Sequence, residues 1–143
     1  MDVKLSLDGK MRIKGTNELG LETYFDTNPN VGGENTAATP MEVMLQAMAA
    51  CAFMDTVSIL RKKRKQVDNL EIEVHGERKK EHPKMFTKVH MKFILTSPDS
   101  ELSDLERSIY LSQTTYCGAS ALFQAAGCEV SWEKEIKRPV VEA

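Results

Sequence analysis

The sequence predicts one globular domain, over residues 1–143, that mixes strands and helices in the order β-β-β-α-β-β-α-α-β. A hydrophobic fraction of 41% with a net charge of -2 is that of an ordinary folded domain. Apolar residues recur with a period of two in several segments, which is typical of strands. Between these segments lies one long stretch that is apolar on almost every helical face, which indicates a buried helix.

The N-terminal part is predicted to form three short strands, because apolar and polar residues alternate there. Turn-forming residues, Asp8-Gly9 and the segment 17–20, separate the three strands. Residues 27–38 contain Pro, Gly and several Asn without any period, so a surface loop is expected before the next element. The strands are expected at residues 3–7, 11–13 and 21–25.

A long central helix follows, and its start is clearly signalled. Thr39 is the predicted N-cap, Pro40 takes the first helical position, and Glu42 completes a T-x-x-E capping box. The helix is expected to run to about Lys65, and Asp55 is its only formal charge between residues 43 and 60. A small domain cannot cover so long an apolar helix alone, so a partner subunit is expected to cover it.

The remaining elements are two long strands, two helices and a last strand. A charged turn, KKEHPK, joins the two strands, and Ser103-x-x-Glu106 is a second capping box that opens the next helix. A short helix then carries Cys117 and ends at Gly127. The strands are expected at residues 70–74, 86–95 and 128–136.

Composition disfavours several classes of function. The pI is near 5.9, so the basic cluster RKKRK at residues 61–65 is better explained as a solvated face than as a nucleic-acid site. The N-terminus has no uninterrupted hydrophobic core, so neither a signal peptide nor a membrane span is expected there, and a cytoplasmic location follows. In a reducing cytosol the three cysteines are expected as free thiols, or as a transient disulfide.

Cys51 and Cys117 are the main candidates for chemistry. They are 66 positions apart, too far for one metal-knuckle motif, but two helices can bring them together, which favours thiol redox chemistry. Taken alone, Cys51 is better explained as a packed apolar residue, and Cys128 is expected only to pack. The histidines show no clustered metal-binding spacing, and no nucleotide fingerprint precedes a helix, so neither a metal nor a cofactor is expected.

Three segments resemble the OsmC/Ohr family of organic hydroperoxide reductases, and most closely its OsmC-like subgroup. They are TPMEVMLQAMAACAFMDTVSILRKKR, GERKKEHPKMFTKVHMKFIL and LSQTTYCGASALF. The P-x-E motif, the helix-borne cysteine and the Y-C helix occur in the family's order, and the match runs from about Gly32 to the last strand. The resemblance implies an α+β fold in which two chains intertwine as a homodimer, with their long central helices packed between two sheets.

The resemblance also implies an activity and its residues. Cys51 corresponds to the peroxidatic cysteine and Cys117 to the resolving one, with Arg12 holding the thiolate and Glu42, or alternatively Glu34, pairing with the arginine. The enzyme would reduce a small organic hydroperoxide, pass through a Cys51 sulfenic acid and a Cys51–Cys117 disulfide, and be recycled by a dithiol reductant, of the lipoyl type, or by a small thiol. The alternative is a slow or non-catalytic sensing or binding dimer. Neither reading requires nucleic acid or a membrane.

Overall fold

The computed structural model describes residues 1–140 of the chain, which divides into two compact units, Met1–Leu45 and Gln46–Ala143. Each unit contains one three-stranded sheet. Helix α1, Pro40–Lys62, begins in the first unit and continues into the second. The elements follow the predicted order, with a short 3-10 helix and a π-helical turn added. The mixed α+β fold class is therefore confirmed.

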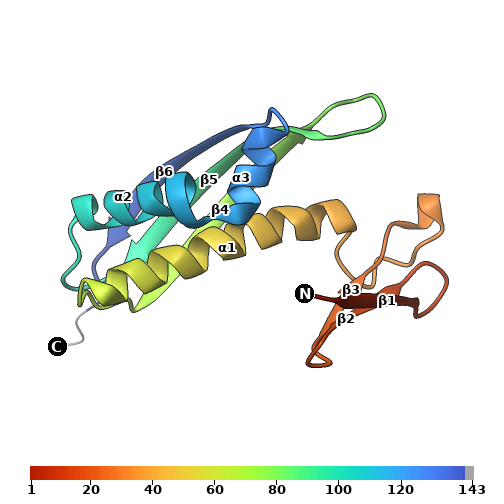
Figure 1. The fold of residues 1–143 in the computed structure, drawn as a ribbon, viewed down its shortest axis with the longest axis horizontal. Coiled ribbons are helices and arrows are strands. Elements are labelled where there is room, and N and C mark those ends of the chain that lie inside the picture. The colour runs from red at the N-terminus through yellow and green to blue at the C-terminus, as the bar shows by residue number, and fades with distance from the viewer. Residues whose placement is uncertain (141–143) are drawn as a thin grey trace. The chain divides into compact units, whose positions relative to one another are not determined.

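The N-terminal unit is an antiparallel meander of three strands, drawn in red and orange in Figure 1. The strands are β1 (Val3–Leu7), β2 (Ile13–Asn17) and β3 (Glu22–Phe25). The second strand begins at the end of its predicted range and extends beyond it. In the segment that was expected to be a loop, residues 29–31 form a 3-10 helix, capped by the Asn28 side chain.

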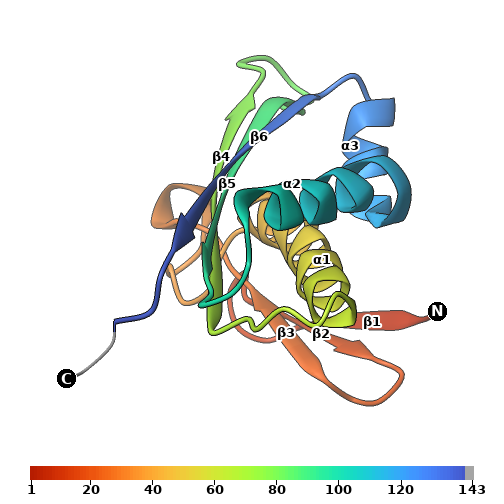
Figure 2. The ribbon, with the colours of Figure 1, turned by 90° about the vertical axis from the view of Figure 1, so that its left-hand side faces the viewer.

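The C-terminal unit packs its helices on one face of a mixed sheet, as Figures 1 and 2 show from two directions. Strand β4 (Asn69–Arg78) pairs antiparallel with β5 (Phe86–Thr96), as expected of a hairpin. Strand β6 (Glu129–Lys137) pairs parallel with β5, and the chain between them crosses over through helices. The crossover elements are α2 (Leu102–Leu111), the π-helical turn η2 (Ser112–Tyr116) and α3 (Gly118–Ala125).

The predicted start of the central helix is confirmed. The backbone N–H of Glu42 donates to Thr39 Oγ1 over 3.3 Å, and the backbone N–H of Thr39 donates to Glu42 Oε1 over 3.2 Å. These two bonds form the reciprocal capping box. The helix ends at Lys62, three residues before the predicted end at Lys65.

The second predicted capping box is wrong by two residues. Helix α2 begins at Leu102 with Glu101 as its N-cap, and the backbone N–H of Glu101 donates to Asp104 Oδ2 over 2.9 Å. Ser103 therefore lies inside the first turn, where its side chain cannot serve as the cap. Both boxes share the spacing of three residues, so the sequence pattern alone did not distinguish them. In α3, Cys117 is the N-cap rather than an interior residue.

The long helix α1 buries only one stripe of its surface within the chain. Its buried residues recur at intervals of three and four, and Met54 on another face is 72% exposed. By length and composition alone the helix could cross a membrane, a property that it shares with core helices of soluble proteins. The buried residues are Met48, Ala49, Ala52, Thr56 and Leu60.

Candidate functional site

Two elements of the C-terminal unit bring the sulfurs of Cys51 and Cys117 together. Cys51 lies in the middle of α1, and Cys117 is the residue that caps α3. Cys51 Sγ, Cys117 Sγ and one carboxylate oxygen of Asp55 all lie within 4.8 Å of one another. All three cysteines of the chain are free thiols. The expectation that two helices bring Cys51 and Cys117 together is confirmed.

Local helix geometry explains why α1 supplies two members of this group. Cys51 and Asp55 are four residues apart, so their side chains lie on the same face of the helix, one turn from each other. This face adjoins the buried stripe, since Ala52 and Thr56 follow them directly and are fully buried. The two functional groups therefore lie at the edge of the core, half-buried, where both protein and solvent reach them.

Cys117 is held more deeply, by a turn of unusual geometry. The π-helical turn η2 interrupts the α-helical path between α2 and α3, and such turns occur frequently at functional sites. The Cys117 side chain is only 4% exposed, and its Sγ lies 3.9 Å from the carbonyl oxygen of Met48 on α1. The Ser120 backbone N–H donates to the same Sγ over 3.3 Å. The turn thus fixes the sulfur against the central helix.

Burial dominates the electrostatics of Cys117. Desolvation raises the pKa of its thiol above the ordinary value, and the nearby Cys51 thiol raises this pKa further. Ser120 acts in the opposite direction, because its backbone N–H donates a hydrogen bond to the sulfur, which favours the thiolate. The net effect is a raised pKa, so Cys117 is a protonated thiol near neutral pH.

Asp55 is fixed by a short chain of hydrogen bonds. Ser112 Oγ donates to Asp55 Oδ2 over 2.9 Å, and Gln113 Nε2 lies 3.4 Å from Ser112 Oγ. The structural hydrogen bond that a charged residue in an apolar helix requires is therefore present. Two further buried polar atoms, Gln113 Oε1 and Ser120 Oγ, have no hydrogen-bond partner within residues 1–140. The surroundings of the two sulfurs are thus more polar than the apolar sequence of α1 suggests.

Arg12 lies in the N-terminal unit, where groups of that unit surround it. Its Nη1 donates to Thr36 O over 3.0 Å and to Thr36 Oγ1 over 2.9 Å, while Nε pairs with Asp8 at 3.3 Å. The guanidinium also lies over the ring of Tyr24, 4.4 Å from its centroid. Cys51 belongs to the other unit, and a contact between Arg12 and Cys51 stays a prediction.

The two candidate glutamates also belong to the N-terminal unit. The Glu42 carboxylate accepts from Thr39, and these hydrogen bonds hold its pKa below the ordinary value. The side chain of Glu34 is exposed, and its backbone N–H donates to Asp26 Oδ2 over 3.4 Å. Within the described contacts Glu42 serves the helix start, and its pairing with Arg12 stays a prediction.

Cys128 does not belong to the group. Its side chain is 6% exposed, burial raises the pKa of its thiol, and its Sγ lies 3.9 Å from the carbonyl oxygen of Glu129. The packing role expected from the sequence agrees with this burial. His90, on β5, bonds to Ser131 and lies beside Glu133 across the parallel pair.

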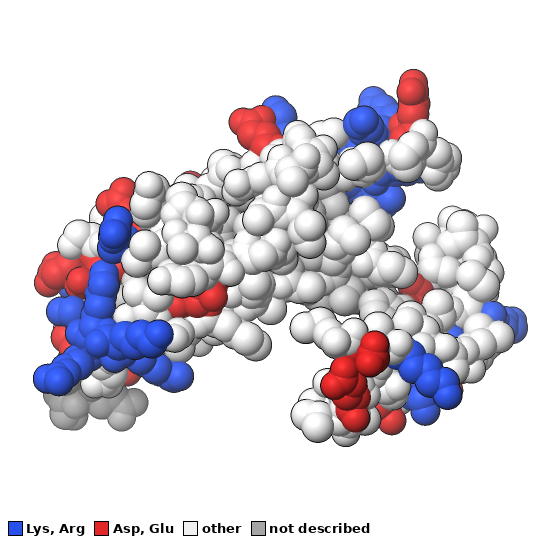
Figure 3. All heavy atoms as spheres, in the orientation of Figure 1, with Lys and Arg blue, Asp and Glu red and all other residues white. Residues whose placement is uncertain are grey.

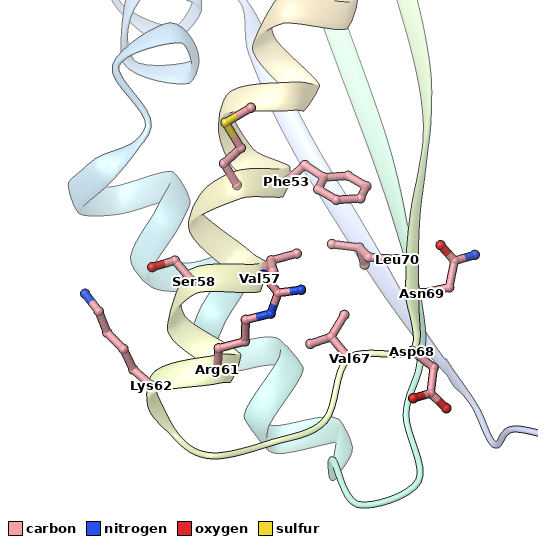
Figure 4. A pocket seen from close by; sticks show the side chains of 10 residues that line it. Phe53, Val57, Ser58, Arg61, Lys62, Val67, Asp68, Asn69 and Leu70 are labelled. Atoms are coloured by element: carbon pink, nitrogen blue, oxygen red, sulfur yellow. The ribbon is translucent and has the colours of Figure 1, made fainter.

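Two surface hollows lie along the exposed side of α1. The smaller, of about 350 Å³, adjoins the cysteine group through Asp55 and is closed by Leu111 and Tyr116. The larger, of about 720 Å³, combines apolar side chains such as Phe53, Val57 and Leu70 with Arg61 and Lys62 at one end, as Figure 4 shows. Figure 3, in the orientation of Figure 1, shows basic side chains gathered at the end of the C-terminal unit where α1 ends, while mostly uncharged residues cover the middle of the unit.

Sequence reasoning did not include Asp55, Ser112 and Ser120 in the site. The four-residue spacing of Cys51 and Asp55 was the available signal for the carboxylate, because it places both on one helix face. Ser112 and Ser120 carry no comparable signal. Their contacts depend on the π-helical turn, which the pattern of apolar residues did not reveal.

Residues 33–133 match the family model described as OsmC-like protein. Protein YhfA of Escherichia coli is 36% identical over 112 residues, which cover 78% of this chain and 81% of that protein. A crystal structure of a hypothetical protein from Aquifex aeolicus is 27% identical, covers 95% of this chain and 96% of its own, and superposes with a TM-score of 0.79. The organic hydroperoxide resistance protein OhrB of Bacillus subtilis shares the fold, at 18% identity and a TM-score of 0.57, over 95% of this chain and 96% of its own.

Proposed function

Because this chain belongs to the OsmC-like protein family, we propose that it is a thiol-dependent peroxidase that reduces organic hydroperoxides. The observation that carries the proposal is the approach of Cys51 Sγ and Cys117 Sγ to within 4.8 Å, in a chain that holds all its cysteines as thiols. The same fold occurs in proteins described as organic hydroperoxide resistance proteins, among them the one from Bacillus subtilis.

The proposed reaction proceeds in three steps: oxidation of Cys51, formation of a disulfide, and reduction of that disulfide. The Cys51 thiolate attacks the terminal peroxide oxygen, the O–O bond breaks, and the departing alkoxide takes up a proton to become an alcohol. Cys51 is then a sulfenic acid. Cys117 attacks its sulfur, water leaves, and a Cys51–Cys117 disulfide forms. A reductant, either a lipoyl-type dithiol or a small thiol, supplies the two electrons and two protons that regenerate both thiols.

The difference in burial between the two sulfurs supports different roles for them. Cys51 is half-buried, so a peroxide in solvent reaches it first, whereas Cys117 is almost fully covered. Burial also raises the pKa of Cys117, which disfavours its thiolate and so supports Cys51 as the first sulfur to react. Closing the disulfide requires the sulfurs to move from within 4.8 Å to a bonded distance of about 2 Å.

The proposed substrate is a small organic hydroperoxide. The hollow beside Asp55 is lined by Ile59, Leu111 and Tyr116, which suits an apolar substituent on the peroxide. Arg12 is proposed to supply the positive charge that stabilises the Cys51 thiolate, with Glu42 or Glu34 to orient it, from the same chain or from a partner. No cofactor takes part in this cycle.

The active form is proposed to be a cytoplasmic homodimer. Met44 and Met54 on α1 are exposed, as are Tyr116 and Leu122 on the segments beside it. A second copy of the chain would remove these apolar side chains from water. The two α1 helices would then pack against each other, as the resemblance to the family implies.

Turnover in variants tests the proposed roles. Replacing Cys51 with serine (Cys51→Ser) is expected to abolish hydroperoxide reduction, because no sulfenic acid can form, while the fold is retained. Cys117→Ser is expected to allow a single rapid oxidation of Cys51 and then stop disulfide-dependent cycling. Cys128→Ser is the matched control and is expected to leave turnover unchanged. Full turnover by Cys51→Ser would refute the proposal.

A second candidate is a sensing or binding dimer that keeps the thiols but reduces peroxides slowly. It is favoured by the contacts of Arg12, whose guanidinium is already bonded to Thr36 and paired with Asp8. The rate at which Cys51 reacts with iodoacetamide at neutral pH separates the two readings. A rate well above that of free cysteine supports the enzyme, and a rate equal to it supports the sensor.

A further inference from the structure

The group formed by Cys51, Asp55 and Cys117 contains a carboxylate that has no role in the proposed peroxidase cycle. The cycle needs two sulfurs, yet a carboxylate lies with them, within 4.8 Å of both. Thiolate sulfur together with carboxylate oxygen is a donor set that zinc accepts, whereas magnesium and calcium prefer oxygen alone. We propose that the reduced protein binds one Zn²⁺ ion per chain through Cys51, Asp55 and Cys117.

The spacing of the three donors is close to that of a tetrahedral site. Zinc lies about 2.3 Å from sulfur and about 2.0 Å from carboxylate oxygen, so neighbouring ligands are roughly 3.5 to 3.8 Å apart. The three donor atoms lie within 4.8 Å of one another, so an inward shift of no more than about 1 Å brings them to this geometry. Cys51 and Asp55 are preset by their positions one turn apart on α1. Three protein ligands leave the fourth position open to water or to a small ligand.

Hydrogen bonds to two of the three proposed ligands also suit a metal site. Ser112 Oγ donates to Asp55 Oδ2, which orients the carboxylate, and the Ser120 backbone N–H donates to Cys117 Sγ. The first bond orients the Asp55 carboxylate, and the second stabilises the thiolate form of Cys117. Ser120 Oγ is fully buried and has no partner within residues 1–140, so a polar group beside Cys117 is not saturated by the protein's own contacts.

The ion and the disulfide exclude each other, since both need the same two sulfur atoms. Zinc is expected to bind only the reduced chain, to protect Cys51 and Cys117 from oxidation, and to be released when they form a disulfide. This inference does not rest on peroxidase activity, because the dithiol form binds the ion whether or not it reduces hydroperoxides.

Cobalt substitution tests the site directly on the reduced, metal-free full chain. Co²⁺ is expected to bind one per chain with sulfur-to-cobalt charge-transfer absorption and the intense visible bands of a tetrahedral ion, and Zn²⁺ is expected to displace it. Cys51→Ser is expected to weaken cobalt binding and to reduce the charge-transfer absorption, because one of the two thiolate ligands is lost. Ser112→Ala keeps all three ligands but loses the bond to Asp55, so about tenfold weaker zinc binding is expected.

Controls keep the result interpretable. Cys128→Ser removes a cysteine outside the group and is expected to bind cobalt as the original chain does. In the original chain under native conditions, Zn²⁺ is expected to slow the alkylation of Cys51, while Cys128 reacts at the same rate with and without the ion, both read by mass spectrometry. Absence of stoichiometric binding, or binding that survives Cys51→Ser unchanged, would overturn the proposal. Neither result bears on hydroperoxide turnover, which is measured separately.

Discussion

At the scale of single residues, the three side chains of the site differ in exposure, in thiol pKa and in hydrogen bonding. Cys51 is reachable from solvent, Cys117 is buried with a raised thiol pKa, and Asp55 is fixed by Ser112 between the helices. The negative carboxylate of Asp55 repels a thiolate that lies beside it. This repulsion is unfavourable unless a positive charge, either the Arg12 guanidinium or a metal ion, lies nearby. Asp55 is thus the residue whose replacement distinguishes these roles.

Replacing Asp55 with asparagine is expected to affect metal binding and thiol reactivity in opposite directions. The amide keeps the size of the side chain and can still accept from Ser112, but it removes the negative charge beside Cys51. Zinc binding is expected to weaken at least tenfold, because a charged ligand is lost. Alkylation of Cys51 at neutral pH is expected to become faster. A slower alkylation rate would show that Asp55 assists thiol ionisation instead.

Asp26 gives the N-terminal unit an acid-sensitive contact. Its carboxylate accepts from Thr36 and from the backbone N–H groups of Thr27 and Glu34, which lowers its pKa to about 2 from 3.8. A lowered folded-state pKa adds stability above the unfolded value, and this stability is lost as pH falls from about 4 towards about 2.

The stability of Asp26→Asn, measured by urea unfolding across this pH range, tests the contact. The difference in unfolding free energy between the original chain and the variant is expected to be largest above pH 4 and to shrink as pH falls. Taking the difference removes the contributions of other carboxylates. A difference that stays constant between pH 5 and about pH 2 would contradict the lowered pKa.

At the scale of elements, the start of α1 depends on two side chains. Thr39→Ala removes the N-cap hydroxyl that Glu42 N–H uses, and a loss of about 1 kcal/mol in unfolding free energy is expected. Ser103→Ala is the control, because Ser103 lies inside the first turn of α2 and caps nothing. An equal loss in both variants would show that the hydroxyl of Thr39 is not what stabilises the helix start.

A close backbone approach makes Gly33 necessary in the loop before α1. A side-chain carbon added there would lie 2.0 Å from the carbonyl oxygen of Thr27, which no shift of a side chain relieves. Gly33→Ala is therefore expected to destabilise the N-terminal unit by several kcal/mol, of the order of strong steric clashes. Gly118→Ala is the control, because nothing lies within 4 Å of the added carbon. Equal thermal stability of Gly33→Ala and the original chain would contradict the described loop.

The sequence predicted elements better than contacts, for a physical reason. Strand periodicity and the Thr39 capping box are local signals, so the element order and the start of α1 were predicted correctly. The box at Ser103 was wrong, since the chain offers an overlapping pair at Glu101 and Asp104 and tertiary packing selects between them. The contacts of Arg12 join residues up to 24 positions apart, and no local pattern encodes them.

At the scale of the whole molecule, the proposed homodimer can be tested at the exposed side of α1. Because Met54 is 72% exposed in the single chain, Met54→Lys is expected to shift the proposed dimer toward monomer, by placing a charge in the apolar interface. Sedimentation velocity at several concentrations measures this shift. Glu81→Gln, an equal change of charge in the exposed β4–β5 loop, is expected to leave the dimer intact. A monomeric original chain would refute the dimer.

The most direct test of the account is the covalent state of the two sulfurs after oxidation. Reduced protein is treated with one equivalent of an organic hydroperoxide, its remaining thiols are alkylated, and its peptides are mapped by mass spectrometry. We predict a disulfide that joins Cys51 to Cys117, with Cys128 alkylated. A disulfide that includes Cys128, or persistent free thiols at both Cys51 and Cys117, would contradict it.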